Sequence, residues 1–483
     1  MWLFSTAPSD GRTRLPSGDT PRIGSTFVEA DFEDFFICIW VRRAEMKVST
    51  FTDTYLPTIN GATYTVNLWK QKWNEGRGEM TVTYPSSRQY TPDDREYPVR
   101  SLPFPFYDGV KLGLPLGAGL SGLLRVLTDT ERSYRPGSQY LATTGDYLRR
   151  GPAAVKQGIT AAAPTGNGGP AAHRRALSRA NPNGNHVMLP EDVRDTDLVH
   201  VHGPFTMGMA GAALAQREDV PLVVNYHTPT DEYVKYITSN DAMARQLKRV
   251  NNWWEKKYLR RADVIVTPSE EAKDWLYEKG IAQEKVTALQ NGIDVDFFSP
   301  TDSSDFEDEW ELSGPVIGYC GRHGYEKCLD DVVAAAARMP DVDVVLVGDG
   351  PARSDLIAQA EELGADNVRF PGFIERERLP EFYSALDAFV FPSDSETEGI
   401  VAMEATACGT PVVGADARGL KNTVKHGVNG YRYPAGDLDA LASAVDRALD
   451  RREELSQNCL EMRDEMKVDR TLDEIEAIYR DLV

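Results

Sequence analysis

Two basic side chains follow directly after an apolar run in the second half of the chain. Arg322 and Lys327 lie in the segment Gly321-Arg322-His323-Gly324-Tyr325-Glu326-Lys327, which comes after residues 316–320. An arginine binds phosphate oxygens through two parallel N–H donors, and a lysine adds a point charge. Ligands of open α/β sheets bind at the carboxyl ends of the strands. This turn therefore suits a diphosphate, although a solvated basic pair at the start of a helix would have the same spacing.

Two carboxylates lie in the segment 391–405, which leaves a second apolar run and enters a helical pattern. Glu396 and Glu404 are eight residues apart, which is roughly 12 Å if measured as helical rise. That separation excludes a single carboxylate pair but suits the two ends of a long ligand; two unrelated surface glutamates are the alternative. Between them, Gly399, Ile400 and Val401 open the helix, where backbone N–H groups and the positive end of the helix dipole favour an anion.

Short apolar runs alternate with helical patterns along most of the chain. This alternation predicts an α/β fold, in which parallel sheets are covered by helices on both faces. In the first half we predict strands at 47–52, 79–84, 197–202, 221–226, 263–267 and 285–289, with helices at 61–74, 241–261 and 270–279. In the second half we predict strands at 316–320, 342–348, 367–370, 388–391 and 411–414. Two doubly wound domains follow from this order, joined near residues 298–308.

The predicted domain organisation begins after a non-conforming N-terminal extension, residues 1–45. We assign residues 46–300 to a first domain, 301–460 to a second domain, and 461–483 to a C-terminal helix that packs back on the first domain. The alternation breaks at residues 118–195, and within it residues 121–190 carry nine Lys or Arg against three Asp or Glu. We interpret this stretch as an irregular insertion; a basic lid, a mobile insert and a disrupted sequence are the open alternatives.

The composition excludes several classes of protein. The chain has 483 residues with 74 acidic and 53 basic side chains, and its net charge of −21 argues against a nucleic-acid-binding role. Its 41% of hydrophobic residues exclude a disordered chain. The 16 lysines and 37 arginines suggest a salt-adapted, halophilic microbe, with an ordinary acidic cytosolic protein as the alternative. The five scattered cysteines form no C-x-x-C pair, and no apolar run approaches the ~20 residues of a membrane span. We therefore expect a cytoplasmic protein that at most contacts a membrane peripherally.

The Glu396-x7-Glu404 pair, followed by Ala-Thr-Ala-Cys-Gly-Thr-Pro-Val-Val, resembles family 4 of the glycosyltransferases, also described as the glycosyl transferases group 1. Further segments match this family in the expected order: 51–57 with Asn60-Gly61, 200–205, 226–228, Pro268-Ser269, 291–294, Gly321-Arg322 with Glu326-Lys327, and 348–351. The resemblance covers residues 46–117 and 196–465. It implies the GT-B fold, in which two Rossmann-like domains face each other across a cleft.

The resemblance also implies an activity. Enzymes of this family move a hexosyl group from a nucleotide-diphosphate sugar to an acceptor, with retention of configuration and without a metal or other cofactor. Glu396 would then hold hydroxyl groups of the donor sugar, and Glu404 the ribose hydroxyls of the nucleotide. Arg322 and Lys327 would neutralise the diphosphate as it leaves, because negative charge develops there in the transition state.

Residues of the first half complete the site that the resemblance implies. Gly61 would let its backbone approach the same phosphates, and His227 would lie near the anomeric carbon and the acceptor. Two residues depart from the family's pattern: Glu398 stands where an aromatic residue is common, and His323 replaces a commoner apolar residue. These departures bear on donor preference rather than on activity.

A metal site and a dinucleotide site are both disfavoured. The two Asp-x-Asp pairs, 294/296 and 341/343, have the form of a metal-chelating motif, but one lies in a linker and the other precedes a strand. Turn and cap residues explain both pairs more simply. Gly348-Asp349-Gly350 lacks the third glycine of a dinucleotide-binding turn, which argues against an oxidoreductase.

The acceptor is indicated only by residues 245–261, which hold seven basic residues and one acidic residue. Trp253, Trp254 and Tyr258 beside that charge suggest contact with an anionic membrane and a lipid or lipid-linked acceptor. A glycan or small-molecule acceptor, with a helix that simply joins two strands, is the alternative. Two other functions stay open: a non-catalytic sugar-nucleotide-binding protein and a GT-B sugar-nucleotide epimerase.

Overall fold

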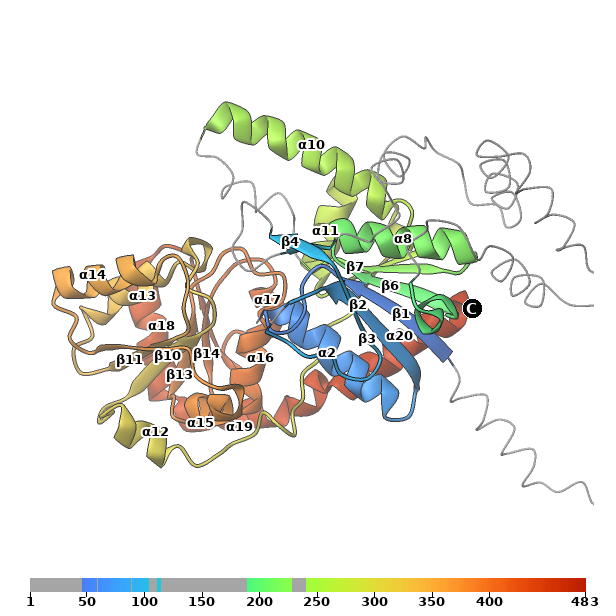
Figure 1. Cartoon of the computed structure of the whole chain (residues 1–483). Coiled ribbons are helices and arrows are strands. Elements are labelled where there is room, and N and C mark those ends of the chain that lie inside the picture. Colours follow the sequence, from blue (N-terminus) through green and yellow to red (C-terminus); the bar gives the residue numbers. More distant parts are fainter. Residues whose placement is uncertain (1–45, 59, 88, 104–110, 114–188, 228–239) are drawn as a thin grey trace, which may run out of the picture. The chain divides into compact units, whose positions relative to one another are not determined.

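The computed structural model describes residues 46–58, 60–87, 89–103, 111–113, 189–227 and 240–483 (Figure 1). The predicted extension, 1–45, lies outside the described residues. The predicted insertion, 118–195, also lies outside them except for its last seven residues, 189–195.

Seven of the described strands form one parallel sheet, in the order β3-β2-β1-β6-β7-β8-β9. Their bounds are β1 (Met46–Thr52), β2 (Gly78–Pro85), β3 (Glu96–Val99), β6 (Leu198–His202), β7 (Leu222–Asn225), β8 (Val264–Thr267) and β9 (Val286–Ala288). The strand order runs outward from β1 to β3 on one side and from β6 to β9 on the other. The direction of winding therefore reverses between β1 and β6.

Six further strands form a second parallel sheet, in the order β12-β11-β10-β13-β14-β15. Their bounds are β10 (Val316–Cys320), β11 (Asp343–Val347), β12 (Val368–Gly372), β13 (Ala388–Phe391), β14 (Val412–Ala415) and β15 (Gly430–Tyr433). Here the winding reverses between β10 and β13. A small antiparallel pair, β4 (Ser101–Pro103) with β5 (Lys111–Gly113), stands apart from both sheets.

The helices follow the strands and cover both faces of each sheet (Figure 1). Side-chain caps start several of them; for example, Asn60 Oδ1 accepts a hydrogen bond from Thr63 N at 2.8 Å. The helices of the first half are α2 (Gly61–Asn74), α7 (Glu191–Arg194), α8 (Thr206–Glu218), α10 (Asp241–Leu259) and α11 (Glu270–Glu278). Those of the second half are α12 (Ser304–Glu309), α13 (Leu329–Ala336), α14 (Arg353–Leu363), α15 (Leu379–Ser384), α16 (Ile400–Ala407), α17 (Leu420–Thr423), α18 (Leu438–Asp450), α19 (Arg452–Glu461) and α20 (Val468–Leu482).

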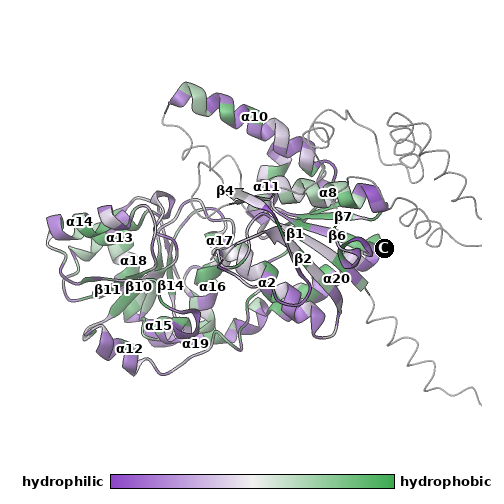
Figure 2. Ribbon diagram, in the orientation of Figure 1, coloured by the Kyte–Doolittle hydropathy of each residue, from purple (hydrophilic) through white to green (hydrophobic). Residues whose placement is uncertain are grey.

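Alternate residues of the first sheet supply two separate cores. Phe51, Val199 and Val201 pack in a cluster with side chains of α8 and α11. Val48 and Leu198, which point to the other face, pack in a cluster with side chains of α2 and α20. Apolar residues on both faces make β7 a hydrophobic run (Figure 2), whereas buried threonines interrupt β1 and β2.

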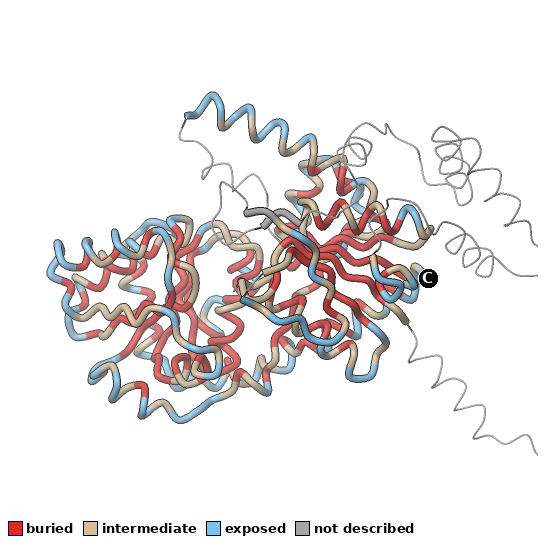
Figure 3. Tube along the Cα trace, viewed as in Figure 1, coloured by how far each residue is buried: buried red, intermediate tan, exposed pale blue. Residues whose placement is uncertain are grey.

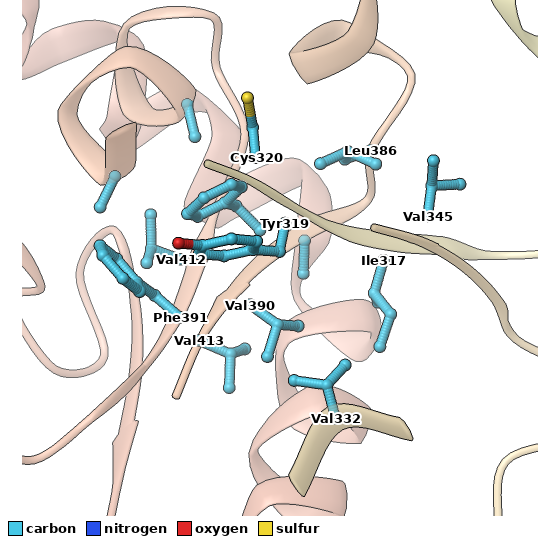
Figure 4. Close-up of a cluster of buried hydrophobic side chains, with 14 of the residues drawn as sticks. Ile317, Tyr319, Cys320, Val332, Val345, Leu386, Val390, Phe391, Val412 and Val413 are labelled. Carbon is cyan, nitrogen blue, oxygen red and sulfur yellow. The ribbon is translucent and has the colours of Figure 1, made fainter. Parts of the chain in front are cut away.

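The second sheet is buried in the same way. Tyr319 of β10 is 1% exposed, and its ring centroid lies 5.6 Å from that of Phe391 of β13 (Figure 4). Ile317, Val345 and Val390 are at most 1% exposed in the same cluster. The inner strands β10, β11, β13 and β14 are buried along nearly their whole length, whereas the edge strand β12 is half-buried (Figure 3).

The last helix, α20, belongs to the packing of the first sheet. Leu472, Ile475 and Tyr479 of α20 are fully buried in the cluster that contains Val48. Outside that core, Arg77 Nη1 pairs with Asp473 Oδ1 of the same helix at 2.6 Å.

The structure confirms the predicted fold class of two doubly wound parallel sheets, and each predicted strand lies within two residues of an observed one. The strands that the apolar pattern did not predict, β3 and β15 among them, are short edge strands with polar or proline residues. Among the described residues, no helix is long and apolar enough to span a membrane.

Candidate active site

Most of the predicted site residues follow the strands at which the two sheets reverse their winding. Arg322 and Lys327 follow β10, and Glu396 follows β13, the neighbouring strand across the reversal. In the other sheet, Gly61 follows β1 and His227 follows β7. The crevice at such a reversal, beyond the carboxyl ends of the strands, is the usual ligand site of open α/β sheets.

Lys327 and Glu396 are in direct contact. Lys327 Nζ forms an ion pair with Glu396 Oε1, and the two side chains are 20% and 17% exposed. Ser393 Oγ donates to the same Glu396 oxygen at 3.1 Å. A charged pair that is partly shielded from water interacts more strongly than one on the open surface. The structure therefore joins the turns after β10 and β13 into one polar cluster.

Arg322 lies in the same turn as Lys327. Its guanidinium pairs with the Glu326 carboxylate four residues later. Ser393 Oγ also lies 3.1 Å from the Glu326 backbone carbonyl oxygen, which connects this turn to the segment that carries Glu396. Arg322 and Lys327 thus each have a carboxylate partner that an incoming phosphate would have to replace.

Gly399 is the residue that immediately precedes α16 and caps its N-terminus. It adopts φ 85°, and a Cβ at this position would lie 2.7 Å from Leu420 Cδ2, so only glycine fits. The backbone N–H groups of Ile400 and Val401 come next, at the positive end of the helix. Gly61 lies opposite, because a Cβ on Gly61 would be 3.1 Å from Ile400 Cδ1. Gly61 and the start of α16 are thus neighbours, as a shared phosphate site requires.

Glu404 is buried rather than open. It is 5% exposed, and one carboxylate oxygen accepts a hydrogen bond from Tyr383 Oη at 2.7 Å. Burial raises the pKa of Glu404 to about 7, against the opposing effect of the Arg376 charge and of the Tyr383 hydrogen bond. The structure thus places Glu404 beneath the site surface, within the electrostatic reach of Arg376.

His227 is held by a second histidine. His227 Nε2 lies 2.8 Å from His202 Nδ1, and burial lowers the pKa of His227 to about 4. The His227 backbone carbonyl accepts a hydrogen bond from Thr397 Oγ1 at 2.5 Å. Since Thr397 follows Glu396 directly, the structure brings together the site residues of the two sheets.

The two departures from the family's pattern both have structural partners. Glu398 is buried, and its carboxylate accepts hydrogen bonds from Asn291 N, at 2.8 Å, and from Asn291 Nδ2. Burial raises the pKa of Glu398 to about 7. His323 is also buried, with Nε2 3.3 Å from the Val347 carbonyl oxygen.

A cavity of about 520 Å³ is lined in part by Arg376, the residue whose charge acts on Glu404. Arg376 projects into an aromatic group on its wall, with its guanidinium carbon 4.3 Å from the ring centroid of Tyr64 and 4.9 Å from that of Phe297. Arg376 Nη1 is buried and has no hydrogen-bond partner in the described part of the chain. Sequence reasoning missed Arg376 and Tyr64, because Arg376-Glu377-Arg378 reads as an ordinary charged loop. The lining is Leu56, Pro57, Tyr64, Asn67, Leu68, Gln71, Tyr90, Asp294, Phe297, Phe373, Glu375, Arg376 and Glu377.

One aspartate of each Asp-x-Asp pair, Asp294 and Asp343, accepts hydrogen bonds from backbone N–H groups. Asp294 Oδ1 accepts hydrogen bonds from the backbone N–H groups of Asp296, at 3.1 Å, and Phe297, at 3.0 Å. Asp343 Oδ2 accepts one from Ser313 N at 3.0 Å. In the described ranges, no cluster of three or more His, Cys, Asp or Glu side chains is arranged to hold a metal ion.

Two family models match adjoining parts of the chain. The model described as Glycosyltransferase Family 4 matches residues 154–297, and the one described as Glycosyl transferases group 1 matches residues 301–465. The chain belongs to this glycosyltransferase family. The family match confirms the resemblance found from the motifs around Glu396 and Glu404.

Curated members of the family align with about half of the chain. The D-inositol 3-phosphate glycosyltransferase of Mycobacterium marinum is 34% identical over 263 residues, which cover 52% of this chain and 55% of that protein. The sulfoquinovosyl transferase SQD2 of Arabidopsis thaliana is 30% identical over 269 residues, 53% of this chain and 50% of that protein. The chain thus spans about half the length of the curated relatives it matches.

Solved structures confirm the GT-B fold. Sucrose-phosphate synthase of Thermosynechococcus elongatus superposes with a TM-score of 0.62 at 20% identity, over 91% of this chain and 99% of that chain. HepE of Anabaena, solved in complex with UDP, superposes with a TM-score of 0.60 at 20% identity, over 90% of this chain and 100% of that chain.

Proposed function

We propose that this protein transfers a hexosyl group from a nucleotide-diphosphate sugar to a hydroxyl acceptor, with retention of configuration and without a metal. The observation that carries the proposal is the cluster at the β10/β13 reversal, where Lys327, Arg322 and Glu396 meet the open helix start at Gly399. Family membership supports the same reaction class.

Each group of the cluster has a role in this reaction. Arg322 and Lys327 compensate the negative charge that grows on the diphosphate as the sugar–phosphate bond breaks, which lowers the barrier. The N–H groups after Gly399 bind a phosphate oxygen at the positive end of α16. Glu396 is released from Lys327 when the diphosphate arrives and accepts hydrogen bonds from hydroxyl groups of the donor sugar.

We place the nucleoside end of the donor beside Arg376 and Glu404. Arg376 lines the cavity, is surrounded by aromatic rings and keeps an unused buried N–H donor. Its charge acts on Glu404, which would accept hydrogen bonds from the ribose hydroxyl groups. The structure of HepE, a protein of the same fold, was solved in complex with UDP-glucose. A uridine-diphosphate sugar is therefore the first donor to test.

Replacing Arg376 by alanine is expected to raise the KM for the nucleotide sugar about tenfold, because it removes roughly 1–2 kcal/mol of cation–π and hydrogen-bond interaction. Steady-state kinetics with varied donor measures this effect. Arg378→Ala is the matched control, since Arg378 pairs with Glu381 and Glu309 and does not line the cavity. An unchanged KM in Arg376→Ala would place the nucleoside elsewhere.

For the acceptor, we propose a lipid or lipid-linked hydroxyl compound reached at an anionic membrane. The first part of α10 is exposed (Figure 3) and carries Met243, Val250 and Trp253, which are 56%, 55% and 56% exposed. Exposed Arg245, Lys248 and Arg249 lie among them. A helix with exposed apolar and basic side chains binds an anionic lipid surface.

The helix α10 has two acidic residues, and only Asp241, at its first position, is exposed. Glu255 is buried and pairs with Lys279, so it adds little to the potential of the outer surface. Because the rest of the chain is strongly acidic, α10 offers a local basic face toward which a negative bilayer would orient the protein.

Vesicle flotation tests the membrane proposal. The protein is expected to float with vesicles that contain anionic lipid and to stay behind with neutral ones. Arg245→Glu, Lys248→Glu and Arg249→Glu together should weaken binding about 100-fold or more, since each basic residue near the surface contributes about 1 kcal/mol. The matched control reverses three exposed charges elsewhere, Arg217, Lys421 and Arg470. The proposal is contradicted if the wild-type protein floats equally well with neutral and with anionic vesicles. It is also contradicted if the two triple variants float equally well with anionic vesicles.

A panel of nucleotide sugars tests the proposed reaction against the two alternatives. A transferase slowly releases nucleoside diphosphate from one donor even without an acceptor. A non-catalytic binding protein binds a donor but never turns it over, and an epimerase returns an altered sugar on the same nucleotide.

A further inference from the structure

The residue that holds His227 lies at the end of a neighbouring strand. His202 ends β6, and in the register of β6 with β7 it pairs with Asn225, two residues before His227. Side chains two residues apart along an extended chain point to the same side. The register thus brings the rings of His202 and His227 together, with centroids 5.1 Å apart and planes 21° from parallel.

The contact between the two rings is a hydrogen bond. His202 Nδ1 and His227 Nε2 are 2.8 Å apart, and His202 is 4% exposed. Asn225 Nδ2 lies 3.4 Å from the first of these atoms and 3.3 Å from the second. The Asn225 side chain therefore contacts both histidine rings, and it is 4% exposed.

The hydrogen bond between His202 Nδ1 and His227 Nε2 contains a single proton. Burial lowers the pKa of His227 to about 4 and that of His202 well below its usual range, so both rings are neutral near pH 7. A neutral imidazole carries one N–H and one bare nitrogen. The short contact needs an N–H on one ring and a bare nitrogen on the other, because two N–H groups would repel and two bare nitrogens would not attract.

The direction of this hydrogen bond therefore determines whether His227 Nδ1 carries a proton. If His202 Nδ1 donates, His227 must carry its proton on Nδ1; if His227 Nε2 donates, its Nδ1 is bare. In both cases the proton position on one ring fixes the proton position on the other, and the bond holds the His227 ring in one orientation.

We propose that His202 is a positioning residue that fixes the tautomer and the ring orientation of His227. This inference rests on the proposed function for its effect on catalysis, but the hydrogen bond itself can be measured without any activity. The neighbouring bond between His200 Nδ1 and Tyr479 Oη, 2.5 Å long, offers a control because it lies in the same histidine group and does not include His227.

NMR of the full chain with 15N-labelled histidine tests the proposal. In the wild-type protein we expect a scalar coupling across the hydrogen bond between His202 Nδ1 and His227 Nε2, and two distinct 15N shifts for a single His227 tautomer. In His202→Phe, which keeps a ring of similar size, the His227 shifts should move toward averaged values. Tyr479→Phe should leave the His227 pattern unchanged. Absence of the coupling in wild type, or an unchanged His227 tautomer in His202→Phe, overturns the proposal.

Kinetics then separates the positioning role from the proposed function. His202→Phe should lower kcat about tenfold, because a misaligned group near the reacting atoms loses rate, while the donor KM changes less than about twofold. Tyr479→Phe should keep the wild-type kcat. A lost kcat with an unchanged His227 tautomer contradicts the positioning role. Wild-type protein that turns over no nucleotide sugar contradicts the proposed function, and the coupling still decides the hydrogen bond.

Discussion

Replacing Lys327 by alanine is expected to lower kcat for sugar transfer by about 100-fold to 1,000-fold, the usual effect of removing one fixed group that stabilises developing charge. Lys327 is held at the β10/β13 reversal by Glu396, so its charge is already in place when the diphosphate begins to leave. The fold should persist, because the side chain is part of the polar cluster and not of the hydrophobic core. Initial rates at saturating donor, together with a circular dichroism spectrum, measure both effects.

The matched control for this variant is another lysine in an ion pair. Lys425 Nζ pairs with Glu465 at 2.8 Å, with side chains 45% and 56% exposed, far more open than the Lys327–Glu396 pair. Lys425→Ala should leave kcat unchanged. Full activity of Lys327→Ala would refute the assignment of the diphosphate to this turn.

Glu396→Gln is expected to lower kcat/KM by about 100-fold or more, because an amide cannot replace the carboxylate as a strong acceptor for sugar hydroxyls. The structure adds a second expectation, since Glu396 is the direct partner of Lys327. The losses in the double variant, Lys327→Ala with Glu396→Gln, should fall well short of additive, as they do for groups that act as a unit.

The pair Lys425→Ala with Glu465→Gln provides the additive reference for this cycle. Rates of the four variants, measured with one donor, give the coupling between the two residues. Additive losses at Lys327 and Glu396 would mean that the two side chains act in separate places.

The fold could be predicted because its strands are buried on both faces. Strands such as β10 and β13 are uninterrupted apolar runs, so their position was readable from the sequence to within a residue or two. The family resemblance implied a common site for Arg322 and Glu396, and in the structure they follow these two neighbouring strands. The order of the strands was not readable, because residue patterns do not determine which parallel strands are neighbours.

Other parts of the site depend on contacts between distant segments. Arg376 looks like one of several charges in a loop, and its environment is created by Tyr64 of α2 and Phe297 of the connecting segment. His202 is the last residue of a buried strand, and the residues next to it in the sequence do not indicate that it contacts His227. Glu398 looks like a surface glutamate but is buried against Asn291, more than one hundred residues earlier.

The central proposal is that the carboxyl ends of β10 and β13 bind the diphosphate of a sugar nucleotide. A crystal structure of the protein with the donor that it turns over tests this most directly. We predict that the phosphate oxygens lie within hydrogen-bond distance of Lys327 Nζ and of the backbone N–H groups that follow Gly399, with the Lys327–Glu396 ion pair broken. A donor bound elsewhere, with that ion pair intact, would contradict this position of the diphosphate site.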